Sequence, residues 1–247
     1  MNRKTIATCS ALAAFAIFAI APATSWGAFL TETINGIQVN IQKEKQVVAY
    51  NEQGTSVKLA SEAFTVECNE VTMTGKVHSN HDFAGNVHVT IEDVWFRGDA
   101  SETRCTDNNT PASVLIPEIT NEGGKQHWCI KNPLNVDEIL IEPRNCTEGA
   151  GGEFKFTVVT TGITCGFKRA EPLKGIATTE DVENKPVTVK MNAGQEFKTD
   201  GVGGHSVFCP ATAKLENFLF EMYTDTALTG PTYRDAASVA DPIFLKK

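Results

Sequence analysis

The sequence has few basic residues and almost no helical periodicity. It carries 22 Lys and Arg against 30 Asp and Glu, which gives a formal net charge of −8. A general nucleic-acid binder would show a basic patch or stripe, so we expect no nucleic-acid partner. After the N-terminal region, no long stretch keeps apolar residues at helical spacing between plausible caps. The composition therefore favours an all-β protein.

Long apolar runs are also absent, except for Ala11–Ala21 near the N-terminus. Basic residues precede this run and small residues follow it, as in a secretory signal peptide. We predict a signal peptide over residues 1–27 with cleavage before Ala28, while Ala21 and Ala23 mark an earlier alternative. The run is shorter than the ~20 residues that a spanning helix needs, so a retained membrane anchor is the weaker alternative. We expect a secreted, extracellular or cell-envelope protein without a membrane span.

The sequence has no CxxC pair, the spacing on which thioredoxin-like redox sites and zinc knuckles depend. Cys9 lies in the predicted signal peptide, and its removal leaves an even number of cysteines. These are Cys68, Cys105, Cys129, Cys146, Cys165 and Cys209. An even set in an exported protein predicts a disulfide framework, for which six cysteines allow 15 pairings. We favour the sequential pairing, Cys68–Cys105, Cys129–Cys146 and Cys165–Cys209.

Alternation of apolar and polar residues, the pattern of half-buried strands, dominates the rest of the chain. The clearest alternating segments are 37–41, 71–77, 87–91, 139–141, 154–158 and 187–191. The apolar phase changes after Ile91, which predicts a β-bulge near Asp93. Leu215–Tyr223 is apolar on both phases and is predicted as one long central strand.

The rhythm of short strands and Gly- and Asn-rich turns predicts an antiparallel β-sandwich. Asn35-Gly36 is the clearest turn dipeptide in the predicted mature chain. We expect one large domain over residues 28–247, with a division into two lobes near the glycine-rich residues 149–152 as the alternative.

Two segments of the sequence contain motifs that are similar to those of other proteins. The early segment Phe64–Val77 (FTVECNEVTMTGKV) joins a cysteine to a TG-containing strand, and the late segment Val207–Thr226 (VFCPATAKLENFLFEMYTDT) joins an FCP motif to a Tyr-containing strand. Together with the mid-chain cysteines, they resemble a loose group of exported, uncharacterised bacterial proteins of the actinobacterial type. The resemblance covers roughly Phe64–Thr226 and implies a secreted, disulfide-bonded, β-rich protein. It supplies no catalytic residues.

A cluster of histidines gives the one candidate metal site. His78 and His81 flank a polar turn that also contains Asp82, and His88 follows on the next predicted strand. Imidazole nitrogens on both sides of a turn are able to bind a divalent cation. Histidine is also common in solvated loops, and we favour that interpretation, so we predict no metal and no cofactor.

The sequence contains no recognisable catalytic constellation. Glu92 and Asp93 are adjacent, so in a regular strand they point to opposite faces and each needs a partner from another strand. Trp95 and Trp128 are interpreted as core residues, with a stacking surface for glycans as the alternative. We therefore expect a non-enzymatic binding or structural protein with an extracellular protein or glycan as partner. The alternative is a secreted hydrolase that acts on polysaccharide with carboxylates gathered from separate strands.

Overall fold

A computed structural model describes residues 29–80, 86–97, 105–115, 127–132, 138–147, 152–160, 163–178, 186–200, 208–224 and 241–246. These residues form strands and connecting turns without any helix, and all strand pairs are antiparallel. The all-β prediction is confirmed. No helix suited to crossing a membrane occurs in the described ranges. The predicted signal peptide lies outside these ranges and stays a prediction.

Eight strands close into a first barrel, here called barrel 1. Their order around the barrel is β3-β6-β7-β10-β11-β14-β15-β18, and the pairing of β15 with β18 closes it. The strands are β3 (Gln46–Asn51), β6 (Glu70–Asn80), β7 (Val87–Arg97), β10 (Trp128–Asn132), β11 (Glu138–Glu142), β14 (Leu173–Thr178), β15 (Thr188–Met191) and β18 (Leu219–Thr224).

The other large ring, barrel 2, is also closed and eight-stranded, in the order β4-β5-β8-β9-β12-β13-β16-β17. Its strands are β4 (Val57–Ala60), β5 (Thr65–Cys68), β8 (Cys105–Asp107), β9 (Thr110–Leu115), β12 (Phe154–Thr160), β13 (Ile163–Arg169), β16 (Gln195–Thr199) and β17 (Thr212–Glu216). The predicted sandwich is therefore wrong, because each set of strands closes on itself. Alternation does not distinguish the two folds, since strands of both bury every second residue.

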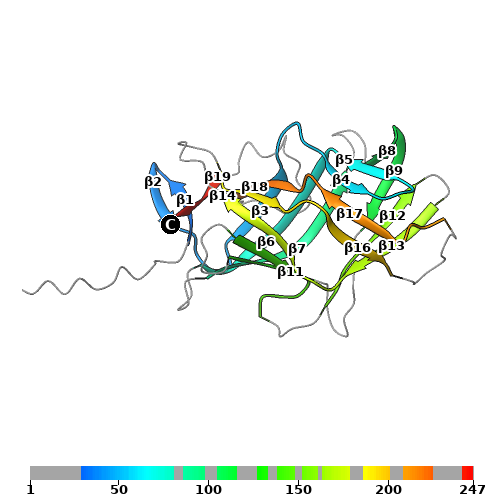
Figure 1. Ribbon diagram of the computed structural model, residues 1–247. Coiled ribbons are helices and arrows are strands. Elements are labelled where there is room, and N and C mark those ends of the chain that lie inside the picture. Colours follow the sequence, from blue (N-terminus) through cyan, green and yellow to red (C-terminus); the bar gives the residue numbers. More distant parts are fainter. Residues whose placement is uncertain are drawn as a thin grey trace, which may run out of the picture.

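The chain builds the two barrels together rather than one after the other. It contributes β3 to barrel 1, then β4 and β5 to barrel 2, then β6 and β7 to barrel 1, and continues in this alternation to β18. The barrels occupy opposite halves of the molecule (Figure 1). Each barrel contains strands from both sides of residues 149–152. We call the region where the chain passes from one barrel to the other the waist.

The buried side-chain amide of Asn51 connects three backbone segments at the waist. Its Nδ2 donates to the carbonyl oxygens of Thr55 at 2.7 Å and Asn69 at 2.8 Å, and its Oδ1 accepts from the backbone N of Val71 at 2.8 Å. The segment predicted as one strand, Leu215–Tyr223, also bends here. Asn217 adopts a positive φ of 53°, so the segment divides into β17 of barrel 2 and β18 of barrel 1.

Three further strands extend barrel 1 on one side. They are β19 (Asp241–Lys246), β1 (Phe29–Ile34) and β2 (Ile37–Asn40), which follow β18 in the order β18-β19-β1-β2. The predicted turn Asn35-Gly36 joins β1 to β2, and both residues adopt the positive φ, 51° and 78°, of a type I′ hairpin. This hairpin lies at the end of the molecule far from barrel 2 (Figure 1).

Two β-bulges interrupt the pairing of β6 with β7. Thr74 faces Asp93 but Gly75 faces Ile91, so Glu92 is the extra residue, and the predicted bulge near Asp93 is confirmed. A side chain at Gly75 would collide with the carbonyl group of Thr90, which explains the glycine in the TG-containing strand. The second bulge inserts His78 into β6 between Val77 and Ser79.

The three disulfides join the sequential pairs that we favoured. Cys68–Cys105 connects neighbouring ends of β5 and β8, and Cys165–Cys209 connects β13 to the residues before β17. Both lie in barrel 2. Cys129–Cys146 joins β10 of barrel 1 to the turn after β11. Three disulfides are consistent with an extracellular location, where oxidising conditions preserve them.

Candidate functional site

The interior of barrel 1 contains a cavity that is partly open to solvent. Its empty space is about 350 Å³, the open part included. Its walls come from strands on most sides of the barrel and from β1 and β19. The lining residues are Leu30, Val87, Val89, Ile130, Asn132, Ile139, Ala177, Val187, Val189, Met222 and Leu245. Nearly all the wall is aliphatic, because every second residue of each strand faces the barrel interior.

Asn132 is the polar member of this lining. Its Nδ2 donates to the carbonyl oxygen of Glu138 at 3.1 Å, across the hairpin formed by β10 and β11. The amide is buried, and it places a hydrogen-bonding group at the edge of an otherwise apolar wall. Sites for small molecules commonly combine apolar walls with a few polar groups of this kind.

The strands β1 and β19 cover part of the cavity. Leu30 of β1 and Leu245 of β19 both line it. The side chain of Asn80 holds β1 in place, since its Oδ1 accepts from Leu30 N at 2.7 Å and its Nδ2 donates to Leu30 O at 2.7 Å and Ile41 O at 2.9 Å. The backbone N of Val187 donates to Ile243 O at 2.6 Å and fixes β19. Hydrogen bonds from barrel 1 thus hold both covering strands, β1 and β19, in place.

Aromatic rings surround another cavity at the waist. Its walls combine residues of both barrels, namely Leu59, Phe96, Trp128, Phe154, Phe156, Leu173, Phe197, Leu215 and Phe218. Trp128 meets the edge of Phe154 with ring centroids 5.1 Å apart, and Phe156 meets Phe197 at 4.8 Å. Trp128 is therefore a core residue, as predicted, whereas Trp95 is only half-buried.

The structure brings together two of the clustered histidines. The bulge at His78 places its ring parallel to that of His88, with centroids 6.5 Å apart and an interplanar angle of 9°. The predicted partners His81 and Asp82 lie outside the described residues. Within the described residues, no three His, Cys, Asp or Glu side chains form a group suited to a metal ion. The metal hypothesis thus has one pair of imidazoles and no observed third ligand.

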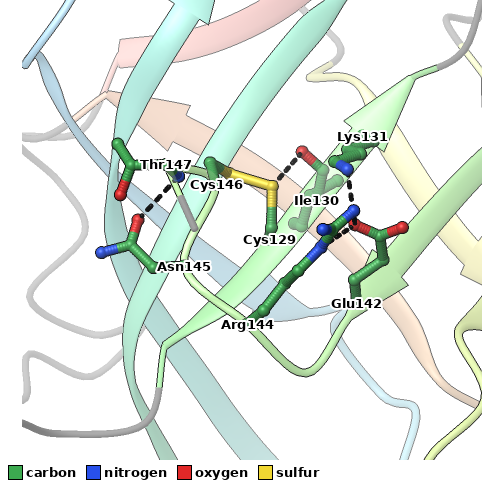
Figure 2. A network of polar contacts seen from close by, with 8 residues as sticks. All are labelled: Cys129, Ile130, Lys131, Glu142, Arg144, Asn145, Cys146 and Thr147. Carbon is green, nitrogen blue, oxygen red and sulfur yellow. Dashed lines mark hydrogen bonds and ion pairs between the residues drawn. A yellow bond between two sulfur atoms is a disulfide. The ribbon is translucent and has the colours of Figure 1, made fainter. Parts of the chain in front are cut away.

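A charged cluster lies beside the disulfide of barrel 1 (Figure 2). The Oε2 atom of Glu142 lies 2.6 Å from Lys131 Nζ and 2.6 Å from Arg144 Nη2, and it accepts a hydrogen bond from Arg144 Nε at 2.6 Å. Partial burial raises the pKa of Glu142, but the hydrogen bonds and charges of Arg144 and Lys131 outweigh burial and hold the pKa below its usual value. The cluster has a structural role, since Lys131 of β10 and Arg144 after β11 both contact the carboxylate of Glu142.

Glu92, one of the two adjacent carboxylates considered for hydrolysis, forms an ion pair, as do other carboxylates of the described strands. The Oε1 atom of Glu92 lies 3.1 Å from Lys76 Nζ, and this hydrogen bond and the charge of Glu92 raise the pKa of Lys76. Glu67 pairs with Lys58, and Glu153 with Lys155 and Lys168. The residues that line the two cavities include no carboxylate. The hydrolase alternative stays a prediction.

Comparisons of the chain with protein-family models, curated proteins and solved structures each find no match. The resemblance to exported proteins of the actinobacterial type therefore stays a prediction. The sequence did identify many cavity residues as buried strand positions. It could not identify the cavity, which exists only because β15 and β18 close the barrel and β1 and β19 cover it.

Proposed function

We propose that this protein is an exported, non-enzymatic binding protein whose site is the cavity of barrel 1. The observation that carries the proposal is the partly open, almost entirely aliphatic cavity inside a closed eight-stranded antiparallel barrel. Barrels of this size have interiors just wide enough to be filled by side chains or to hold one small ligand. The three disulfides support the extracellular part of the proposal.

The walls indicate the class of ligand. Aliphatic side chains favour an aliphatic ligand, whose burial releases water from both surfaces at about 25 cal/mol per Å² of apolar area. The space of about 350 Å³ includes open solvent and is therefore an upper limit, so a ligand is no larger than a small molecule or the end of an alkyl chain. Among the described lining residues, Asn132 is the one with a polar side chain, and its Oδ1 is the atom that a ligand hydroxyl would have to reach. A short aliphatic alcohol fits all three properties.

Titration with 1-hexanol tests the proposal. We expect the methyl resonances of Val89, Ile139 and Val189 to shift and to saturate, while those of barrel 2 residues such as Val66 stay in place. The melting temperature should rise with alcohol concentration, because a ligand that binds only the folded state stabilises it. Shifts that spread evenly over both barrels, or none at all, would contradict the proposed site.

A matched pair of variants locates the binding. Ala177 lines the cavity, so Ala177→Leu fills part of it and should weaken hexanol binding by about tenfold or more, equivalent to about 1.4 kcal/mol. Ala193 is exposed in the turn between β15 and β16, and Ala193→Leu adds the same side chain away from the cavity. Equal binding by the two variants would show that hexanol does not enter barrel 1.

A further inference from the structure

We propose that β2 is an association edge through which two copies of this chain pair antiparallel. Among the described strands, β2 alone has a single hydrogen-bonded neighbour, which is β1. All the others pair on both edges, because both barrels are closed and β19 and β1 lie between β18 and β2. On the outer edge of β2 the carbonyl oxygen of Asn40 accepts a long bond of 3.3 Å from the exposed Gln42 Nε2, which another strand would displace, and the backbone groups of Gln38 face away from β1.

The edge is short, but it lacks the charges, proline and bulges that normally discourage such pairing. Natural edge strands carry charges, proline or bulges that discourage contact with other strands. From Thr33 to Gln42 the chain has no charged residue and no proline, and the pairing of β1 with β2 is free of bulges. At the hairpin tip, 46% of Ile34 and 66% of Ile37 is exposed. An uncharged edge with an apolar tip is typical of an association surface.

The composition of β2 favours a second copy as the occupant. The whole chain has a net charge of −8, so two copies repel each other over most of their surfaces. The uncharged edge is a place where identical chains meet without this repulsion. The alternation of the strand is also self-complementary. With Val39 opposite its own equivalent, Gln38 faces Asn40, and the apolar sides of the two strands form one continuous surface.

The contact is short, which sets the strength of the association. A stable interface buries about 1,200–2,000 Å², and a pair of four-residue strands with one hairpin tip falls below this range. We therefore expect a reversible dimer that forms at high protein concentration. The dimer is independent of hexanol binding, because no residue of β2 lines the cavity of barrel 1.

Sedimentation of the full chain between about 1 µM and about 1 mM tests the proposal. The mean mass of the wild type should rise toward twice the monomer mass. Gln38 is exposed on β2, and Gln38→Lys places two like charges at the two-fold contact, which should weaken the dimer at least tenfold. Gln53→Lys makes the same change in net charge at an exposed position outside the edge and should dimerise as the wild type does.

Two results would overturn the proposal. A wild type that stays monomeric over the whole range would show that β2 does not pair with itself, whatever else it binds. A Gln38→Lys variant that dimerises as strongly as Gln53→Lys would place the contact elsewhere on the molecule. Circular dichroism of both variants at low concentration distinguishes loss of association from loss of folding, since both side chains are exposed in the monomer.

Discussion

The two barrels have the same number of strands and the same connectivity, yet their interiors differ. Phenylalanine rings pack against one another inside barrel 2, where Phe167 lies 5.9 Å from Phe64 and 5.4 Å from Phe156 between ring centroids, and some of them line the cavity at the waist. Aliphatic side chains, by contrast, make up nearly the whole lining of the cavity in barrel 1. Barrel 2 also has two of the three disulfides, whereas barrel 1 has one.

This difference separates the scaffold from the proposed site. Aromatic rings in mutual contact and cross-links between strands restrict motion of an interior, which suits a support. Side chains that line a cavity make fewer van der Waals contacts than side chains in a filled interior. The cavity therefore lowers the stability of barrel 1 relative to a filled interior. Because the strands alternate between the barrels, barrel 2 also fixes the ends of the strands that form barrel 1. We therefore expect barrel 2, with two of the three disulfides, to support the strands around the cavity of barrel 1.

Removal of single disulfides should produce the largest losses of stability in either barrel. Cys68–Cys105 closes 37 residues and Cys129–Cys146 closes 17, so the chain-entropy relation gives losses of about 4 and about 3 kcal/mol. Replacement of each pair by alanine, followed by urea unfolding, measures both. An equal loss, or a larger loss from the barrel 1 pair, would show that cross-linking does not favour barrel 2.

Leucine in place of a buried alanine compares the two interiors directly. Ala213 of barrel 2 is fully buried opposite Phe197, and overpacking there should cost about 1–3 kcal/mol. Ala177 of barrel 1 adjoins the cavity, so Ala177→Leu should leave the free energy of unfolding unchanged or raise it. Urea unfolding of the two variants tests this. A similar loss in both would mean that barrel 1 is as tightly packed as barrel 2.

The sequence predicted individual strands better than their assembly. Alternation located β6, β7 and β12 correctly, and the change of phase after Ile91 located the bulge at Glu92, because both depend on nearest neighbours along the chain. The break at Asn217 was missed because β17 and β18 are both apolar and the positive φ of Asn217 has no distinct sequence pattern. Closure of the barrels was missed because it depends on pairs such as Val189 with Phe220, far apart in sequence.

The candidate site shows the same limit. Val87, Val89 and Ile139 were recognised as inward-facing residues, but nothing in a strand pattern shows whether the interior is full. That property depends on the sum of side-chain volumes from strands that meet only in the folded barrel. The hydrogen bonds between Asn80 and Leu30 could not be predicted either, because the two residues are 50 positions apart in the sequence. Sequence position alone gives these residues no distinguishing pattern.

Substitution of Glu142 should have the smallest effect of these changes. It tests whether the charged cluster beside the single disulfide of barrel 1 contributes to stability. Burial raises the pKa of Glu142, but Arg144 and Lys131 hold it below the usual value, so ionised Glu142 stabilises the fold. This contribution is complete above the unfolded pKa of about 4.3 and is lost as the pH falls through the lower pKa of the folded protein. Glu142→Gln should therefore reduce the free energy of unfolding by about 1 kcal/mol at neutral pH and by less in acid. Urea unfolding at both pH values measures the difference, with the exposed Glu138→Gln as control. A loss that does not change with pH would mean that Glu142 acts through packing rather than through its charge.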